Sequence, residues 1–335
     1  MRKVYMSFLG LGFFDKEKKE YRYTPTTYEL NNAVSKETEF VQVAEMELLN
    51  AKEFDLVLII ATEKSYKTHF SNLEMQMKNF EVYPVHLEID EKMDSKSQWQ
   101  WFEKILCYIE IGDELTVDLT HGYRSVPIVF SAAINFLQKA KNIKINAVYY
   151  GAFEANRGSA PIIDMKDFYN INEWAESVTR LVEDADARKM AEVAGKASEI
   201  QMGELNDPEV IETFENLTNT IRNVDVNNVA EKAEKAIELI REKKKHASET
   251  GKILLDLVID KFVCLTTGEP VSGMYDKAYF NIQLKIIRLL LDHRLYMQAY
   301  TVMRELIGSI GMIPSTLIFF DPFMLKKNDP ILHNT

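Results

Sequence analysis

The stretch VDLTHGYRSVPIVFSAAINFL, from Val117 to Leu137, joins a strand-like run to a helix-like run through a cluster of polar residues. A turn between a strand and a helix needs only a glycine and a capping residue. This one instead places Asp, Thr, His, Gly and Arg within residues 118–124. The apolar residues at 126–140 then recur with helical periodicity. The stretch therefore predicts a strand–loop–helix unit of an α/β fold with its chemistry in the loop.

The same alternation extends over the first half of the chain. Strand-like segments lie at 3–12, 54–62, 80–89, 113–122 and 143–154, and helix-like segments lie at 37–51, 68–80, 97–110 and 126–140. Strands as uniformly apolar as LVLII are typical of a mostly parallel sheet that is covered on both faces. We therefore expect a Rossmann-like architecture, in which ligands bind at the carboxyl ends of the strands.

Beyond about residue 172 the helical period and the Ala, Glu, Lys and Leu content predict an all-α second half. We expect an α/β domain at 1–172, a charged helical linker or arm at 173–250, and a helical effector region at 251–335.

Composition is that of a globular protein, with 335 residues, 46% of them hydrophobic and 27% charged. No apolar run is long enough for a membrane helix. The N-terminus could be misread as a secretory signal, but its short apolar run fits a first strand better, so we expect a cytoplasmic protein. Cys107 and Cys264 both lie in apolar stretches, which predicts reduced core thiols and no metal site.

The net charge of −11 argues against a surface that coats long nucleic acid, so DNA is not an expected partner. It does not exclude a small anionic ligand, because backbone N–H groups and a few basic side chains can bind phosphate inside an acidic protein.

Two strand ends carry weaker signals. Gly10 and Gly12 follow the first strand as a GxG that lets the backbone approach an anion, although a plain tight turn is equally consistent with it. After the second strand, Thr62 and Ser65 can cap a helix, and Lys64 can contact a phosphate.

The fourth strand end carries the strongest signal. Asp118 is expected to support the loop through hydrogen bonds, while Thr120 and His121 face the tip and Gly122 allows a left-handed turn. Arg124 lies in the first helical turn, where the macrodipole disfavours a cation, so an anionic ligand would explain it. The alternative is that His121 caps the helix and Arg124 pairs with an acidic neighbour.

The fifth strand ends in Tyr149, Tyr150, Gly151 and Ala152. These aromatic rings suit either stacking on a base or filling of the core. With three strand ends offering small residues, donors and aromatics, a nucleotide-like ligand is the leading interpretation.

The segments SFLGLG, ETEFVQVAEMELL, IIATEKSY, DLTHGYRSVP and INAVYYGAFE together resemble the CRISPR-associated Rossmann fold (CARF) family, in the branch with an Asp-x-Thr-His-Gly-x-Arg motif. The segment LDHRLYMQAYTVMRELI, Leu291 to Ile307, is similar to the helical region that follows in that branch. The resemblance covers about residues 1–310.

This resemblance implies a homodimer that binds a cyclic oligoadenylate second messenger across its two-fold axis, with cyclic tetra-adenylate as the expected form. It places Gly10, Gly12, Thr62, Lys64, Ser65, Thr120, His121, Gly122 and Arg124 in the ligand pocket. No cofactor other than this activating ligand is implied.

Relatives in this family usually carry a HEPN ribonuclease, in which an Arg-x4-His motif cleaves single-stranded RNA. Arg241 with His246, and Arg288 with His293, have that spacing. We take Arg241 and His246 as the catalytic candidates of a ligand-gated ribonuclease, since His exchanges protons near neutral pH and Arg stabilises the phosphorane.

Two alternatives remain. The family's nuclease motif would be expected downstream of Arg304 and Glu305, in a stretch without arginine, so the effector could be truncated and the chain a sensor. Lys64, Thr120 and His121 could also help the pocket cleave the ring itself. A dinucleotide-dependent dehydrogenase is disfavoured, because the third glycine of the fingerprint is missing.

Overall fold

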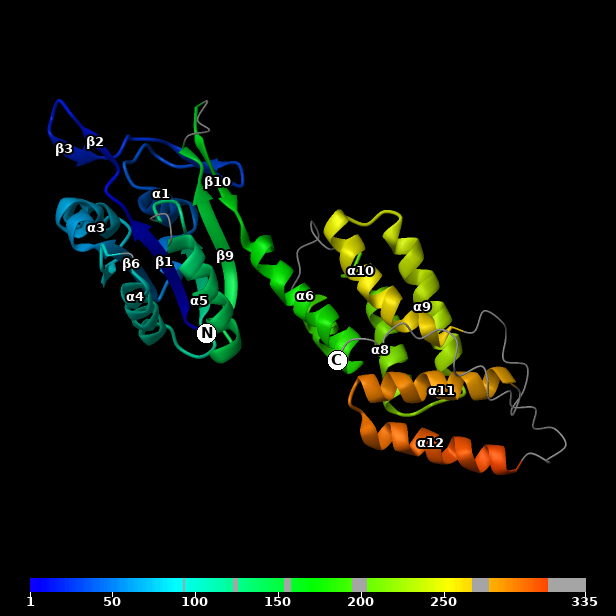
Figure 1. Ribbon diagram of the computed structural model, residues 1–335. Helices are drawn as coiled ribbons and strands as arrows, with labels where there is room; N and C mark the ends of the chain where they lie inside the picture. Colours follow the sequence, from blue (N-terminus) through cyan, green and yellow to red (C-terminus); the bar gives the residue numbers. More distant parts are fainter. Residues whose placement is uncertain (93, 123–125, 154–157, 195–203, 267–276, 313–335) are drawn as a thin grey trace. The chain divides into compact units, whose positions relative to one another are not determined.

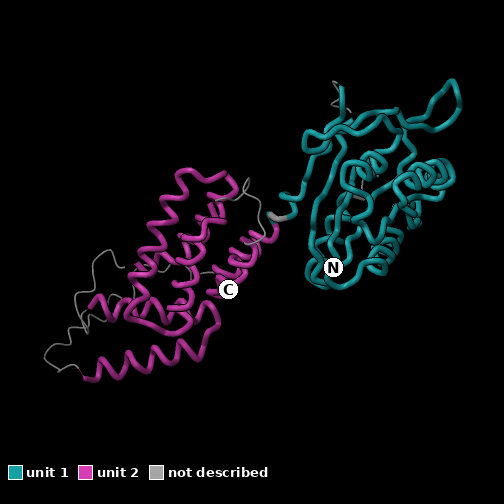
Figure 2. The backbone as a smooth tube through the Cα atoms, turned by 180° about the vertical axis from the view of Figure 1, so that it is seen from behind, with its two compact units in different colours: residues 1–171 teal, residues 172–335 magenta. Residues whose placement is uncertain are grey.

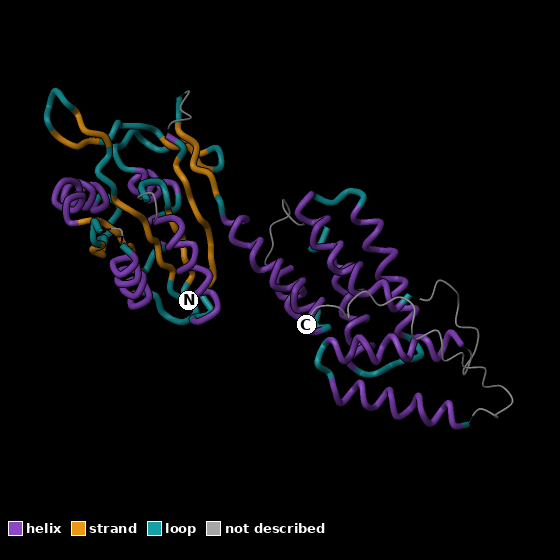
Figure 3. Tube along the Cα trace, viewed as in Figure 1, coloured by secondary structure: helices purple, strands orange, loops and turns teal. Residues whose placement is uncertain are grey.

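The computed structural model describes residues 1–92, 94–122, 126–153, 158–194, 204–266 and 277–312 (Figure 1). The chain divides into two compact units, residues 1–171 and 172–335 (Figure 2). Figure 3 shows that the strands belong to the first unit and that the second is helical in its described part. The expected α/β architecture followed by an all-α region is confirmed.

The first unit is built on an eight-stranded sheet in the order β5-β4-β10-β9-β8-β1-β6-β7. The five strands from β9 to β7 are parallel to their neighbours. These five are β1 (Lys3–Leu9), β6 (Leu56–Thr62), β7 (Val85–Ile89), β8 (Glu114–Asp118) and β9 (Lys144–Gly151). Each lies within one of the segments expected from the sequence.

Helices α1 and α3 cover one face of this sheet, and α4 and α5 cover the other. Their bounds are α1 (Val41–Leu48), α3 (Ser71–Lys78), α4 (Ser95–Tyr108) and α5 (Val126–Ala140). Alternate residues of β1 serve the two layers, because successive side chains point to opposite faces. Val4, Met6 and Phe8 pack toward α4 and α5, whereas Tyr5 and Leu9 pack toward α1 and α3.

Several short strands were not expected from the sequence. They are the separate hairpin β2 (Phe13–Asp15) and β3 (Glu20–Arg22), the pair β4 (Tyr28–Leu30) and β5 (Ala33–Val34), and β10 (Ala160–Asp164), which runs antiparallel to β9. Strands β2 to β5 have only two or three residues, which is too short to give a recognisable period in the sequence.

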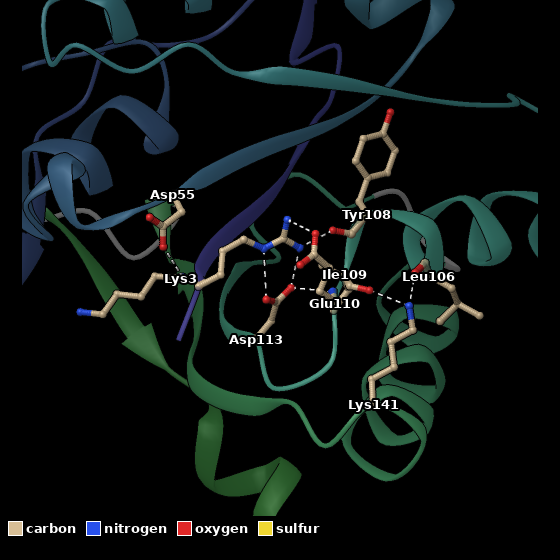
Figure 4. A network of polar contacts seen from close by, with 9 residues as sticks. Lys3, Asp55, Leu106, Tyr108, Ile109, Glu110, Asp113 and Lys141 are labelled. Carbon is tan, nitrogen blue, oxygen red and sulfur yellow. Dashed lines mark hydrogen bonds and ion pairs between the residues drawn. The ribbon is translucent and has the colours of Figure 1, made fainter.

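An ion-pair network holds β1 and β8 together at the amino-terminal edge of the sheet, opposite the carboxyl ends of the parallel strands (Figure 4). The Arg2 guanidinium donates two hydrogen bonds to Asp113, at 3.1 Å and 2.7 Å. Burial would raise the pKa of Asp113, but hydrogen bonds from Arg2 and from the Glu110 amide outweigh it and lower that pKa. Lys141 donates to two backbone carbonyls at the end of α4. This edge is structural.

The second unit packs its helices around one continuous core. The helices are α6 (Lys166–Asp184), which carries the chain over from the first unit, α7 (Arg188–Ala194), α8 (Pro208–Arg222), α9 (Val229–Lys244), α10 (Glu249–Phe262), α11 (Lys277–Asp292) and α12 (Tyr296–Gly311). Asp207 caps α8 through the amide of Glu209, with Pro208 in the first turn.

The charged segment that we expected to be a linker or arm belongs to that core. Phe214 and Leu217 on α8, and Ile237 and Ile240 on α9, are buried among residues of α10 to α12. The charges of the described residues in 173–250 lie on the solvated faces of amphipathic helices, so a high charge content did not indicate a projecting element.

Both cysteines are exposed, which corrects the prediction of core thiols. Cys107 lies on the solvent side of α4, because the buried positions of that helix are Ser97, Trp101 and Ile105. Among the described residues, no helix is both long and apolar enough to span a membrane.

Replacing Phe214 by Ala should test whether α8 is part of the packed core. We expect a loss of about 3–5 kcal/mol in the free energy of unfolding, because the ring is fully buried. Asn216, exposed on the same helix, provides the matched control. Equal urea midpoints for Phe214→Ala and Asn216→Ala would contradict the packing described here.

Candidate functional site

The carboxyl ends of the central strands meet at one edge of the sheet, where the direction of chain winding reverses. From β1 the chain builds β6 and β7 on one side, and then returns to build β8 and β9 on the other. The reversal lies between β1 and β8, the place where open α/β sheets form a ligand crevice. The Asp-x-Thr-His-Gly stretch follows β8, so it lies at this point.

A cavity of about 740 Å³ opens at this edge. Its lining comes from the residues after β1, β6 and β8, from Ile89 at the end of β7, and from the β2–β3 hairpin, which lies beyond the end of β1 in Figure 1. The volume is within the range of small-molecule sites, and apolar and aromatic side chains dominate the lining, as in such sites.

Most of the ligand-binding residues proposed from the sequence come together here. Gly10, Gly12, Thr62, Lys64, Ser65, His121 and Gly122 all line the cavity. Arg124 lies outside the described residues. Thr120 is not among the lining residues, because its hydroxyl is turned toward the sheet.

The Asp118 carboxylate holds the loop after β8 in place. It is fully buried and accepts hydrogen bonds from the Ser7 hydroxyl at 2.6 Å, from the Thr120 amide at 2.9 Å and from the Thr120 hydroxyl at 2.5 Å. The Thr120 hydroxyl in turn accepts from the Gly151 amide at 2.7 Å. Asp118 and Thr120 thus tie β1, β8 and β9 together, and the supporting role expected for Asp118 fits this geometry.

Two polar side chains of α1 extend this buried network. Gln42 donates to the Ser7 hydroxyl at 3.0 Å and to the Phe8 carbonyl at 2.9 Å. Glu45 accepts a 2.6 Å hydrogen bond from the Tyr5 hydroxyl. Burial and the nearby Asp118 charge raise the pKa of Glu45 well above its usual value. Burial also raises the pKa of Asp118, although the hydrogen bonds from Ser7 and Thr120 oppose that shift.

Gly12 shapes the junction between β1 and the hairpin. Its φ is +68°, and a Cβ atom there would lie 2.3 Å from the Arg22 carbonyl oxygen. Gly10 tolerates a side chain better, since a Cβ would lie 3.4 Å from the His121 carbonyl oxygen. Backbone geometry alone therefore explains why residue 12 of the GxG is a glycine.

Gly122 does not adopt the left-handed conformation that we expected. Its φ is not positive, and its amide instead donates to the Leu119 carbonyl at 3.1 Å. The constraint is space, because a Cβ would lie 3.3 Å from that carbonyl oxygen and 3.4 Å from the Pro127 ring.

Thr62 acts as the helix cap foreseen from the sequence. Its hydroxyl accepts from the Ser65 amide at 3.3 Å. Lys64 leaves this turn toward the hairpin, where its ammonium donates to the Tyr21 hydroxyl at 3.3 Å and lies 4.5 Å from the centre of the Tyr21 ring.

His121 packs against Tyr23, with ring centres 4.7 Å apart, and its Nε2 is buried without a hydrogen-bond partner among the described residues. Burial, followed by repulsion from His69, lowers the pKa of His121 to about 4. The imidazole is therefore neutral at pH 7.

Sequence reasoning missed the aromatic wall of the cavity. Phe13, Tyr21 and Tyr23 come from the hairpin region, and Phe153 comes from beyond β9. Of the aromatics that we had proposed for base stacking, Tyr149 is buried in the core and neither Tyr149 nor Tyr150 lines the cavity. The signal for the hairpin was the pair of aromatic segments FF and YRY on either side of a charged turn.

The two Arg-x4-His segments differ in the second unit. Arg241 in α9 and His246 just beyond it are both exposed. Arg288 is exposed, whereas His293 is buried, donates a hydrogen bond from its Nδ1 to the Glu183 carbonyl at 2.5 Å, and stacks on Phe262. Arg288 and His293 therefore do not form a common site.

No family model matches the chain. A curated relative, CRISPR-associated protein MJ1674 of Methanocaldococcus jannaschii, is 26% identical over 223 residues. The chain is a distant homologue of a CRISPR-associated protein. The match covers 64% of this chain and 32% of the relative, so it spans about a third of the relative's length.

Substituting Gly12 by Ala should cost more than about 2 kcal/mol in the free energy of unfolding, because strained φ and a backbone collision act together. Gly112 is the control, since its φ is +80° but nothing lies within 4 Å of a Cβ built there. Gly112→Ala should cost about 1 kcal/mol. Equal losses in urea unfolding would show that the contact with Arg22 is not limiting.

His121 should remain neutral at pH 6, where an unperturbed histidine is mostly protonated. Since its folded pKa lies below its unfolded pKa, the unfolded chain binds the proton first as the pH falls from about 6.5 toward 4. His121 thus lowers stability over that window, and His121→Asn should flatten the slope. Imidazole ¹⁵N shifts, assigned with this variant, provide the direct measurement; a protonated ring at pH 6 would contradict the prediction.

Proposed function

We propose that this protein senses a cyclic oligoadenylate, cyclic tetra-adenylate being the expected form, through a CARF-type first unit acting in CRISPR-based antiviral defence. The observation that carries the proposal is the aromatic cavity at the β1–β8 reversal, lined by His121 and Gly122 of the Asp-x-Thr-His-Gly motif and by the GxG. The homology to a CRISPR-associated protein supports it independently.

The cavity's chemistry suits a ligand that combines bases with phosphates. Phe13, Tyr21 and Phe153 offer ring faces to bases, and Lys64 offers a cation to phosphate. Glu39 and Glu91 also line the cavity, so phosphates are expected at Lys64 and the GxG rather than at these carboxylates.

A cavity of about 740 Å³ has the size of a site for one drug-sized ligand, which is smaller than a ring of four nucleotides. We propose that two copies of the chain share the ring, each taking half of it. A symmetric ligand on a two-fold axis meets identical contacts from both copies, as a closed dimer requires.

An exposed apolar surface beside the cavity supports a homodimer. Ile128 and Phe136, 72% and 49% exposed, lie on one face of α5, and Trp99 of α4, 64% exposed, continues it through Phe102. Ile128 lies six residues after Gly122, so this face reaches the edge where the cavity opens. Contiguous exposed apolar side chains of this kind favour association.

For the second unit we propose a ribonuclease gated by the ring, with Arg241 and His246 as its catalytic candidates on single-stranded RNA. Ligand binding would shift the helical unit toward an active arrangement. The exposure of Arg241 and His246 leaves both accessible to RNA.

The second candidate function is a sensor or ring nuclease without RNA cleavage. It is favoured by the buried, stacked position of His293, which removes one of the two Arg-x4-His matches as a catalytic pair. In a ring nuclease, Lys64 and His121 would position the ring, since a neutral imidazole can accept a proton from a ribose hydroxyl.

The test is incubation of the full chain with cyclic tetra-adenylate and a fluorescent RNA, following ring and RNA together. Lys64→Ala and Arg124→Ala should each weaken ring binding about 10-fold through loss of a charge-assisted hydrogen bond. Lys67→Ala is the control, because Lys67 pairs with Glu63 in the same segment. Wild type that does not bind the ring would reject the proposal.

RNA cleavage that needs the ring and is lost in His246→Ala would identify the gated ribonuclease. Intact RNA with a bound ring would identify a sensor, and intact RNA with a linearised ring would identify a ring nuclease.

A further inference from the structure

Among the described residues, Lys64 makes a polar contact that joins the β2–β3 hairpin to the strand ends of the main sheet. Lys64, after β6, donates to the Tyr21 hydroxyl on β3 and lies over the Tyr21 ring. Tyr21 also packs its ring against Phe14, with centres 5.0 Å apart and planes at 62°. The Lys64 ammonium therefore covers a face of a half-buried ring that lines the cavity.

Lys64 is available to a ligand. Lys67, in the same segment, pairs with Glu63, whereas none of the described residues forms an ion pair with Lys64. A cation–π contact at a partly exposed site is weaker than a charge-assisted hydrogen bond to a phosphate. A phosphate entering the cavity would therefore take Lys64 from Tyr21.

We propose that Tyr21 is the base-stacking residue of the cavity, and that the ligand exchanges Lys64 from the Tyr21 ring to a phosphate while a base takes the vacated ring face. The inference rests on the proposed function, because it assumes a ligand with both bases and phosphates. The inference also assigns base specificity to Tyr21. An aromatic ring favours stacking of a purine over a pyrimidine, since the larger ring system buries more area.

Binding of cyclic tetra-adenylate and cyclic tetra-uridylate to the full chain tests the platform. Tyr21→Phe keeps the ring and should bind the adenine ring within about 3-fold of wild type, whereas Tyr21→Leu and Tyr21→Ala should lose about 10-fold or more. The preference for adenine over uracil should shrink in the last two variants. Tyr83→Ala, at an exposed tyrosine of the same unit outside the cavity, is the matched control.

A double-mutant cycle tests the exchange. In each single variant, Lys64→Ala or Tyr21→Leu, one ligand contact is lost, but ligand binding no longer costs the free energy of breaking the Lys64–Tyr21 contact. In the double variant both ligand contacts are lost, whereas that free energy is saved only once. Its affinity loss should therefore exceed the product of the single losses by about 2-fold to 5-fold.

The outcomes separate the two proposals. Wild type that binds neither ring rejects the proposed function and this inference with it. A wild type that binds the adenine ring, with Tyr21→Leu matching Tyr83→Ala, overturns the role of Tyr21 and leaves the function standing. If the affinity loss of the double variant equals the product of the two single losses, the proposed exchange of Lys64 from Tyr21 to a phosphate is overturned. Melting curves of Tyr21→Leu, whose side chain keeps most of the volume, exclude a simple folding defect.

Discussion

The buried Asp118 carboxylate is the constraint on which the candidate site depends. It lies at the end of β8, opposite Ser7 in the register of β1, and accepts hydrogen bonds from Ser7 and from both donors of Thr120. A buried charge is tolerated only when it is well hydrogen-bonded. These bonds fix the direction in which the chain leaves β8, so His121 and Gly122 reach the cavity while Thr120 turns back to β9.

Two polar side chains of helix α1 extend the hydrogen-bond network around Asp118. Gln42 reaches the same Ser7 hydroxyl, and burial together with the nearby Asp118 charge raises the pKa of Glu45 well above its usual value. Helix α1 is therefore attached to the strand ends by polar contacts as well as by its apolar face. A buried network of this kind specifies one position of the helix on the sheet, which packing alone does less sharply.

The sequence was sufficient for the parallel sheet and its covering helices, because apolar strands such as LVLII and the helical period of 126–140 are strong local signals. It also identified seven residues that line the cavity, since parallel strands end at a common edge.

The sequence did not predict features that depend on contacts between residues far apart in the chain. The hairpin aromatics Phe13 and Tyr21 reach the cavity only through the turn at Gly12, and Cys107 is exposed because of its place around α4. Charge at 182–250 suggested an arm, but the spacing of the apolar residues there decided the packing.

The hairpin forms a two-stranded sheet of its own and shares no strand pairing with the eight-stranded sheet. Its residues can therefore be exchanged without disturbing the hydrogen bonds of β1, β8 and β9 or the support of Asp118. The eight-stranded sheet therefore supports the cavity, whereas the proposed selectivity lies in the hairpin, a separate piece of backbone. A library confined to residues 13–22, with Gly12 kept, would sample new ligands on an unchanged frame, which makes this short segment the natural place to redirect what the cavity recognises.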